Sequence, residues 1–96
     1  MSPIIKSKEV NNVPTISMFY GILILMHLTR KEHSPPHIHA YYGQYDAAFQ
    51  ISDGEILHGT FPNQGKKLVK SFILKYHNEL MNMWETEQYI KLPPIE

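Results

Sequence analysis

The sequence predicts an α+β fold, in which a four-stranded, mainly antiparallel sheet packs one face against a single long C-terminal helix. Two observations indicate this class. Short runs of β-branched, aliphatic and aromatic residues, separated by glycine, proline and aspartate, occupy residues 22–61. Over residues 64–88 the apolar residues instead recur at steps of three and four, the spacing of an amphipathic helix.

The first strand is expected over residues 22–28, where Gly21 precedes an almost uninterrupted aliphatic run. Such a run is typical of a fully buried strand, with a helical segment as the alternative. Pro35 and Pro36 then exclude a helix, because proline lacks an amide hydrogen and restricts the residue before it. They favour an extended chain that leads into the next strand.

Residues 37–42 and 45–51 are expected to form a hairpin around Gly43 and Gln44, since glycine at the first central position suits a type II′ turn. Pairing outward from this turn separates the side chains into an apolar face and a polar face. The polar face collects His37, His39, Tyr41, Asp46, Ala48 and Gln50. A slip of one residue would mix the two faces, so the separation supports this register.

A fourth strand is expected over residues 56–61, after a turn at residues 52–55. The helix follows from about Gln64 to about Gln88, with Asn63 as its expected N-cap. Its apolar stripe, which should face the sheet, consists of Val69, Phe72, Ile73, Tyr76, Leu80, Met83 and Trp84.

The length of 96 residues suits one domain, expected over residues 13–90, with a flexible N-terminal extension at 1–12 and a tail at 91–96. Nine basic and nine acidic residues balance, so the total charge does not indicate a strongly basic nucleic-acid binder. The lack of cysteine excludes disulfides, thiolate zinc sites and a cysteine nucleophile, and agrees with a cytoplasmic location. The apolar stretch 18–28 is shorter than the roughly 20 residues of a membrane-spanning helix, so no membrane contact is expected.

Three of the six histidines fall within seven positions, at His33, His37 and His39. On a strand His37 and His39 share one face, with Cα atoms roughly 6–7 Å apart. Imidazole is a common ligand of zinc, copper, nickel and iron. With His33 from the preceding loop and Asp46 from across the hairpin, the pair forms a candidate site for a divalent metal. The alternative is that these rings face water or hydrogen-bond to backbone groups.

The same two residues, His37 and His39, are also candidate catalytic residues. The reference pKa of imidazole is about 6.5, so one ring can serve as general base and the other as general acid. A ribonuclease or a metal-dependent hydrolase would use such a pair, with Tyr41 and basic side chains assisting.

The expected helix has lysines and no acidic residue in its first half, and glutamates in its second half. The helix dipole favours the reverse order, so the lysines favour a phosphate-binding end rather than helix stability. A solvated helix face is the alternative. The candidate nucleic-acid-binding residues are Arg30, Lys31, Tyr41, Lys66, Lys67 and Lys70.

Several segments together resemble one known family. They are residues 13–22, the histidine and proline segment at 32–40, residues 42–43, residues 54–57 and the helix that ends near residues 84–85. On these segments the chain resembles the bacterial domain-of-unknown-function family 4160, from residue 13 to about residue 90. The family carries no established activity that could be transferred. The resemblance implies a small bacterial protein, and some members of the family lie beside candidate toxin–antitoxin or regulatory partners.

The function we expect is a small binding module of toxin–antitoxin or regulatory type. It would contact a protein partner, RNA or DNA through the face that bears the histidines. Its oligomeric state is open, and a homodimer is compatible with the sequence. A histidine-dependent enzyme is the second hypothesis, and a plain metal-binding module is the third.

Overall fold

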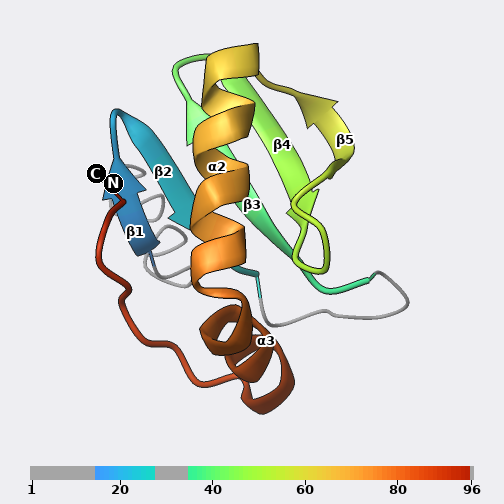
Figure 1. Ribbon diagram of the computed structural model, residues 1–96, viewed down its shortest axis with the longest axis vertical. Helices are drawn as coiled ribbons and strands as arrows, with labels where there is room; N and C mark the ends of the chain where they lie inside the picture. The colour runs from blue at the N-terminus through green and yellow to red at the C-terminus, as the bar shows by residue number, and fades with distance from the viewer. Residues whose placement is uncertain (1–14, 28–34, 96) are drawn as a thin grey trace, which may run out of the picture.

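A computed structural model, which describes residues 15–27 and 35–95, has a five-stranded antiparallel sheet with a helix across one face (Figure 1). Each strand pairs with the next one along the chain, in the order β1-β2-β3-β4-β5. The strands are β1 (Thr15–Phe19), β2 (Ile22–Leu25), β3 (His37–Tyr42), β4 (Tyr45–Gln50) and β5 (Ile56–Thr60). The helices are α2 (Asn63–Lys75) and α3 (His77–Thr86). The predicted α+β class is confirmed.

The prediction of four strands is wrong, because Thr15–Phe19 forms an additional strand at the edge of the sheet. It pairs with β2 through a tight turn at Tyr20 and Gly21. Both residues have positive φ, 51° and 79°, as a type I′ turn requires. Tyrosine rarely occupies such a position, so the sequence lacks the Asn-Gly or Asp-Gly signature that would have indicated this hairpin.

The hairpin of β3 and β4 has the predicted register, from His37 opposite Gln50 to Tyr42 opposite Tyr45. Gly43 has a φ of 59° and Gln44 has no positive φ, as expected for a type II′ turn. Alternation of polar and apolar residues was therefore sufficient to place every side chain of this hairpin on the correct face.

The prediction of one long helix is also wrong, because the helix is interrupted at Tyr76, where φ is −109° and ψ is 28°. No proline or glycine marks the interruption, and the Tyr76 ring still packs on Phe72 at 5.1 Å between ring centres. Helix α2 begins at Asn63, so Pro62 and not Asn63 occupies the cap position. The interruption turns the chain, and α3 lies beyond the end of the sheet (Figure 1).

The predicted apolar stripe forms the helical side of the core across both helices. Phe72 is fully buried, and its ring centre lies 5.0 Å from that of Phe19 on β1. Of the predicted stripe only Tyr76 is partly exposed; the buried members are Val69, Phe72, Ile73, Leu80, Met83 and Trp84. The apolar face of the sheet supplies Ile22, Ile24, Ile38, Ala40, Ala47 and Phe49 to the same core.

The segment 87–95 has no regular secondary structure but contacts the folded core. Leu92 is buried, and its N–H donates a hydrogen bond of 2.9 Å to the carbonyl oxygen of Ile16. The segment thus runs beside β1, the strand at one edge of the sheet (Figure 1). The extension predicted at 1–12 lies outside the described residues. Within the described part of the chain, no helix is long and apolar enough to cross a membrane.

Substituting Gly65, in the first turn of α2, should test the packing of this helix. A Cβ atom there would lie 2.8 Å from Cε2 of the buried Phe61 ring. Alanine normally stabilises a helix by roughly 0.5–1 kcal/mol relative to glycine. Here we expect Gly65→Ala to destabilise by about 1 kcal/mol, because Phe61 must shift within a packed core. Urea unfolding measures the effect, with the exposed Gln64→Ala as the control; a Gly65→Ala protein at least as stable as wild type would contradict the expectation.

Candidate histidine site

Four imidazole rings gather on the face of the sheet that points away from α2. His37 and His39 belong to β3, His58 belongs to β5, and His27 lies two residues beyond the end of β2. Together they form what we call the histidine group. The face that carries them, made of the outward side chains of the five strands and His27, is the histidine face.

Sheet register explains why these rings meet. Leu25, His39, Ala48 and His58 pair in one row across four strands, so their side chains share a face. His39 lies on β3 and His58 on β5, with β4 between them, so the backbones of their two strands are roughly 9–10 Å apart. Because only the small, fully buried Ala48 stands between them, their ring centres come within 6.3 Å.

His39 lies at the centre of the histidine group. Its ring centre is 4.3 Å from that of His27 and 5.1 Å from that of His37. The His37 ring in turn lies 5.2 Å from the ring of Trp84 on α3. The start of β3 therefore joins the histidine group to α3.

The surroundings of His39 favour the uncharged ring. Burial, reinforced by the charges that His27, His37 and His58 would carry, lowers the pKa of His39 to about 4. Burial and the proximity of His37 also lower the pKa of His27. At neutral pH the His39 ring is therefore uncharged, so it does not carry the acidic proton that a general acid needs.

Hydrogen bonds fix part of the group. The Nδ1 atom of His37 lies 2.8 Å from the carbonyl oxygen of Pro35. A carbonyl only accepts, so Nδ1 carries the hydrogen and Nε2 of the neutral ring presents its lone pair. The buried Nε2 atom of His27 has no hydrogen-bond partner among the described residues.

The structure brings only two members of the predicted metal set together, His37 and His39. Asp46 is exposed and pairs with Tyr41 in the hairpin; its charge, added to burial, raises the pKa of the Tyr41 hydroxyl. His33 lies outside the described residues. Among those described, no three histidine, cysteine or acidic side chains are placed to hold one metal ion. The four-residue set thus stays a prediction.

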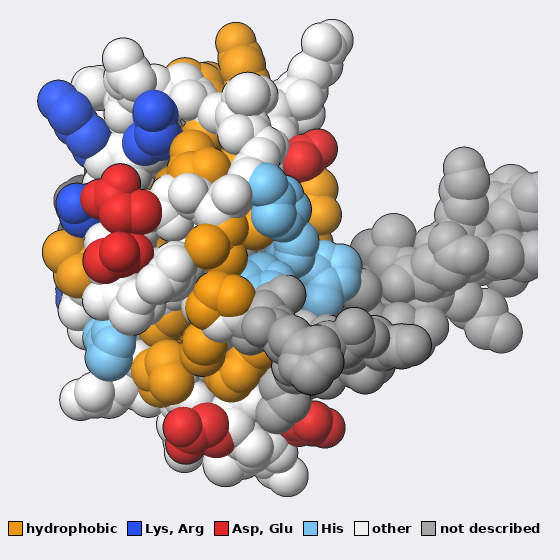
Figure 2. Space-filling model, turned by 90° about the vertical axis from the view of Figure 1, so that its right-hand side faces the viewer, with side chains coloured by type: hydrophobic (Ala, Val, Ile, Leu, Met, Phe, Trp, Pro, Cys, Tyr) orange, Lys and Arg blue, Asp and Glu red, His pale blue; other side chains and the backbone are white. Residues whose placement is uncertain are grey.

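The predicted nucleic-acid-binding residues are divided between two sides of the molecule. Tyr41 lies on the histidine face, whereas Lys66, Lys67 and Lys70 lie on α2, and Figure 2 shows lysine and clustered histidine side chains on separate parts of the surface. The lysines line an open pocket of about 310 Å³ together with Phe49, Gly54, Glu55 and Ile56. Arg30 and Lys31 lie outside the described residues.

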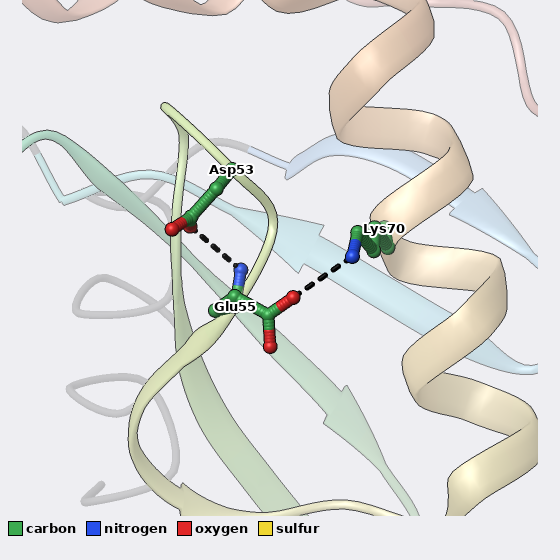
Figure 3. A network of polar contacts seen from close by, with 3 residues as sticks. All are labelled: Asp53, Glu55 and Lys70. Atoms are coloured by element: carbon green, nitrogen blue, oxygen red, sulfur yellow. Dashed lines mark hydrogen bonds and ion pairs between the residues drawn. The ribbon is translucent and has the colours of Figure 1, made fainter.

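Lys70 is engaged within the protein at this pocket. Its Nζ atom lies 2.8 Å from Oε2 of Glu55, and this contact raises the pKa of Lys70 (Figure 3). The N–H of Glu55 donates to the Asp53 carboxylate at 3.0 Å, which holds the loop in place. Lys66 and Lys67 are therefore the better placed of the three lysines to meet an external anion.

His27 and His58 were not predicted from the sequence as members of the site. His27 follows Leu23 and Leu25 in strict alternation, which is a signal for a shared face. His58 lies in a predicted strand, but nothing in the sequence gave the register between that strand and β4. The pairing of these two strands contains a register shift, which alternation alone does not indicate.

The chain matches the model of a known family. Residues 21–85 match the model of the family described as Domain of unknown function (DUF4160). The match includes all four members of the histidine group, the whole of α2 and all of α3 except its last residue. No curated protein and no solved structure matches the chain.

Proposed function

This chain belongs to the domain-of-unknown-function family DUF4160, and from that premise we propose that it is a small binding module whose histidine face contacts a partner protein. We propose further that the pair is of toxin–antitoxin or regulatory type. The observation that carries the proposal is the composition of the histidine face, which combines apolar, aromatic and imidazole side chains with almost no charge.

The apolar side chains come from the edge and centre of the sheet. Met18 on β1 is 60% exposed, and Leu23 and Leu25 on β2 are half-buried. Tyr41 and the histidine group continue this surface across β3 and β5. In the described part of the face, Asp46 is the one formally charged side chain. Depletion of charge with enrichment in aromatic residues and methionine characterises the cores of protein–protein interfaces.

The same observation disfavours nucleic acid as the ligand of this face. Binding to a phosphate backbone depends on lysine and arginine, which release counterions from the nucleic acid. The lysines of the described chain lie on α2 and in the C-terminal segment, not on the histidine face.

The two edges of the sheet are less suited to binding a partner than its histidine face is. At β1 the carbonyl oxygen of Ile16 already accepts a hydrogen bond from the C-terminal segment. At β5 the register shifts opposite Ala48 and Phe49, leaving Leu57 as an extra residue, and Gly59 has a φ of 93°. Such irregularities interrupt the row of backbone groups that an added strand needs.

The test uses variants that place charge on either side of the molecule. Leu25→Glu and Met18→Glu alter the histidine face, and Leu74→Glu, at a residue 54% exposed on α2, is the matched control. Wild type and the control should capture the same protein from an extract of the source cells. The two face variants should lose it, and calorimetry with the purified partner should show the same pattern. Capture of RNA or DNA instead, or equal partner affinity of all variants, would overturn the proposal.

Removing both central imidazoles should separate binding from stability. The double variant His37→Gln/His39→Gln is expected to lose within about 1 kcal/mol of unfolding free energy at pH 7.5, because both positions are partly exposed. Its affinity for the captured protein should fall at least tenfold. Circular dichroism and urea unfolding measure the first effect and calorimetry the second. A double variant that does not fold would show that the imidazoles are structural.

A further inference from the structure

The pair His37 and His39 has a geometry that the partner-binding role does not require. The two residues lie two positions apart on β3, on the same face. Their ring centres are 5.1 Å apart, and the ring planes are inclined by 70°. The rings are therefore not stacked on each other, and their nitrogen atoms can be directed toward a common point.

This separation matches that of two imidazoles on one metal ion. In a tetrahedral site each ligating nitrogen lies about 2.0–2.1 Å from zinc, which places the centres of two such rings about 5.2 Å apart. The His27 and His39 rings, at 4.3 Å, are too close for this arrangement, and those of His39 and His58, at 6.3 Å, are too far apart. The geometry singles out one pair, in agreement with the lack of a three-residue site among the described side chains.

The hydrogen bond from His37 to Pro35 supports the same assignment. Ligating histidines usually donate their second ring N–H to a carbonyl or a carboxylate, which fixes the ring and its tautomer. The Nδ1 atom of His37 makes this contact at 2.8 Å, leaving Nε2 to bind. The adjacent Pro36 limits the conformations of the chain that carries the carbonyl. The ring of His37 is thus oriented before any ligand arrives.

We propose that His37 and His39 bind one divalent transition-metal ion, with water in the remaining coordination positions. Imidazole nitrogen suits zinc, copper and nickel, whereas magnesium and calcium prefer oxygen ligands. No lysine or arginine of the described chain lies on this face to repel a cation. The proposal is tested separately from the partner-binding role: zinc binding is measured without a partner, and partner affinity is to be measured with a chelator present.

The experiment titrates zinc chloride into the full 96-residue chain, prepared without a polyhistidine tag, at pH 7.5. Wild type should bind one zinc ion per chain. His37→Gln and His39→Gln should each weaken binding at least tenfold, while His58→Gln and His77→Gln, the latter on α3, should bind as wild type does. Absence of saturable binding, or equal binding by all four variants, would overturn the proposal.

A second measurement on the unmodified chain guards against variants that fail to fold. Copper(II) at one equivalent should give an electron paramagnetic resonance spectrum with hyperfine splitting from two imidazole nitrogens. A spectrum equal to that of copper in buffer, or splitting from a single nitrogen, would contradict the two-histidine site. Copper(II) added to the zinc-loaded protein should displace the zinc, because both ions would use the same ligands and copper(II) binds imidazole nitrogen more tightly.

Discussion

Phe72→Ala is expected to lower the free energy of unfolding by about 3–5 kcal/mol, the range for a large aromatic side chain removed from a core. Phe72 is fully buried and packs between Phe19 of the edge strand and Tyr76 at the helix break. Its loss would leave a cavity between sheet and helix that neither neighbour can readily fill. Trp84→Ala, at the contact of α3 with His37, should fall in the same range. Urea unfolding followed by circular dichroism measures both effects.

A domain of this size has a free energy of unfolding of only about 5–15 kcal/mol. Either variant should therefore unfold at a much lower urea concentration than wild type. The matched control is Leu74→Ala, at an exposed position of the same helix, which should stay within about 0.5 kcal/mol of wild type. Melts of Phe72→Ala that overlay those of Leu74→Ala would show that α2 does not pack on the sheet through this face.

Acidification should destabilise the protein between pH 6.5 and pH 4 through His39. In the unfolded chain this ring has its ordinary pKa of 6.5, and in the folded chain the pKa is about 4. Above pH 6.5 both states hold the neutral ring, so stability does not vary with pH through this group. Between the two values the unfolded state binds a proton that the folded state does not, so stability falls as pH falls. Below pH 4 both states are protonated and the loss is complete.

The shift in the pKa of His39 corresponds to roughly 3 kcal/mol at 1.36 kcal/mol per pH unit. Because the ring is only partly buried, solvent screening reduces the expected loss to about 2 kcal/mol. Urea unfolding at pH 7.0, 5.5 and 4.0, with a chelator present, measures it. Carboxylates also titrate in this range, so the relevant quantity is the difference between wild type and His39→Gln, with His77→Gln as control. Equal losses in wild type and His39→Gln would show that the ring is not kept neutral.

The hairpin was predictable because its information is local. Six pairs of residues follow from one turn, and the alternation of side chains fixes which face each one occupies. The apolar stripe of the helices was predictable for a similar reason, since its period depends only on helix geometry. The edge strand β1 was not predictable, because its turn is made by Tyr20 and Gly21, and tyrosine carries no turn signal.

The charged residues on either side of Tyr76 are compatible with the break between α2 and α3. Lys75 falls in the last turn of α2 and Glu79 in the first turn of α3. Each has the sign that the dipole of its own helix favours, although in one continuous helix neither residue lies at an end. The pair Lys75 and Glu79, near the middle of the apolar stripe, is therefore compatible with the end of one helix and the start of another. The apolar period itself continues through the break, because both helices face the same core.

The candidate site was predicted in part. His37 and His39 were correctly placed together on the polar face of the hairpin, but the other two rings of the histidine group come from outside it. A long segment, 26–36, joins β2 to β3, and β5 pairs with β4 through a shifted register. His27 and His58 reach His39 only because β2 and β4 flank β3, and because Ala48 leaves room above it. Topology of this kind is a property of the whole sheet and cannot be obtained from any one segment.

The short contact between Leu92 and Ile16 has a consequence for the behaviour of the protein in concentrated solution. Residues 91–95 add no strand to the sheet. The N–H of Leu92 nevertheless donates to the carbonyl oxygen of Ile16 at the outer side of β1, and the Leu92 side chain is buried. A chain that ended at Lys91 would uncover this side of β1, and exposed strand edges are templates on which other chains aggregate. Such a truncated protein should give light scattering that rises with concentration, whereas the full chain should stay clear under the same conditions.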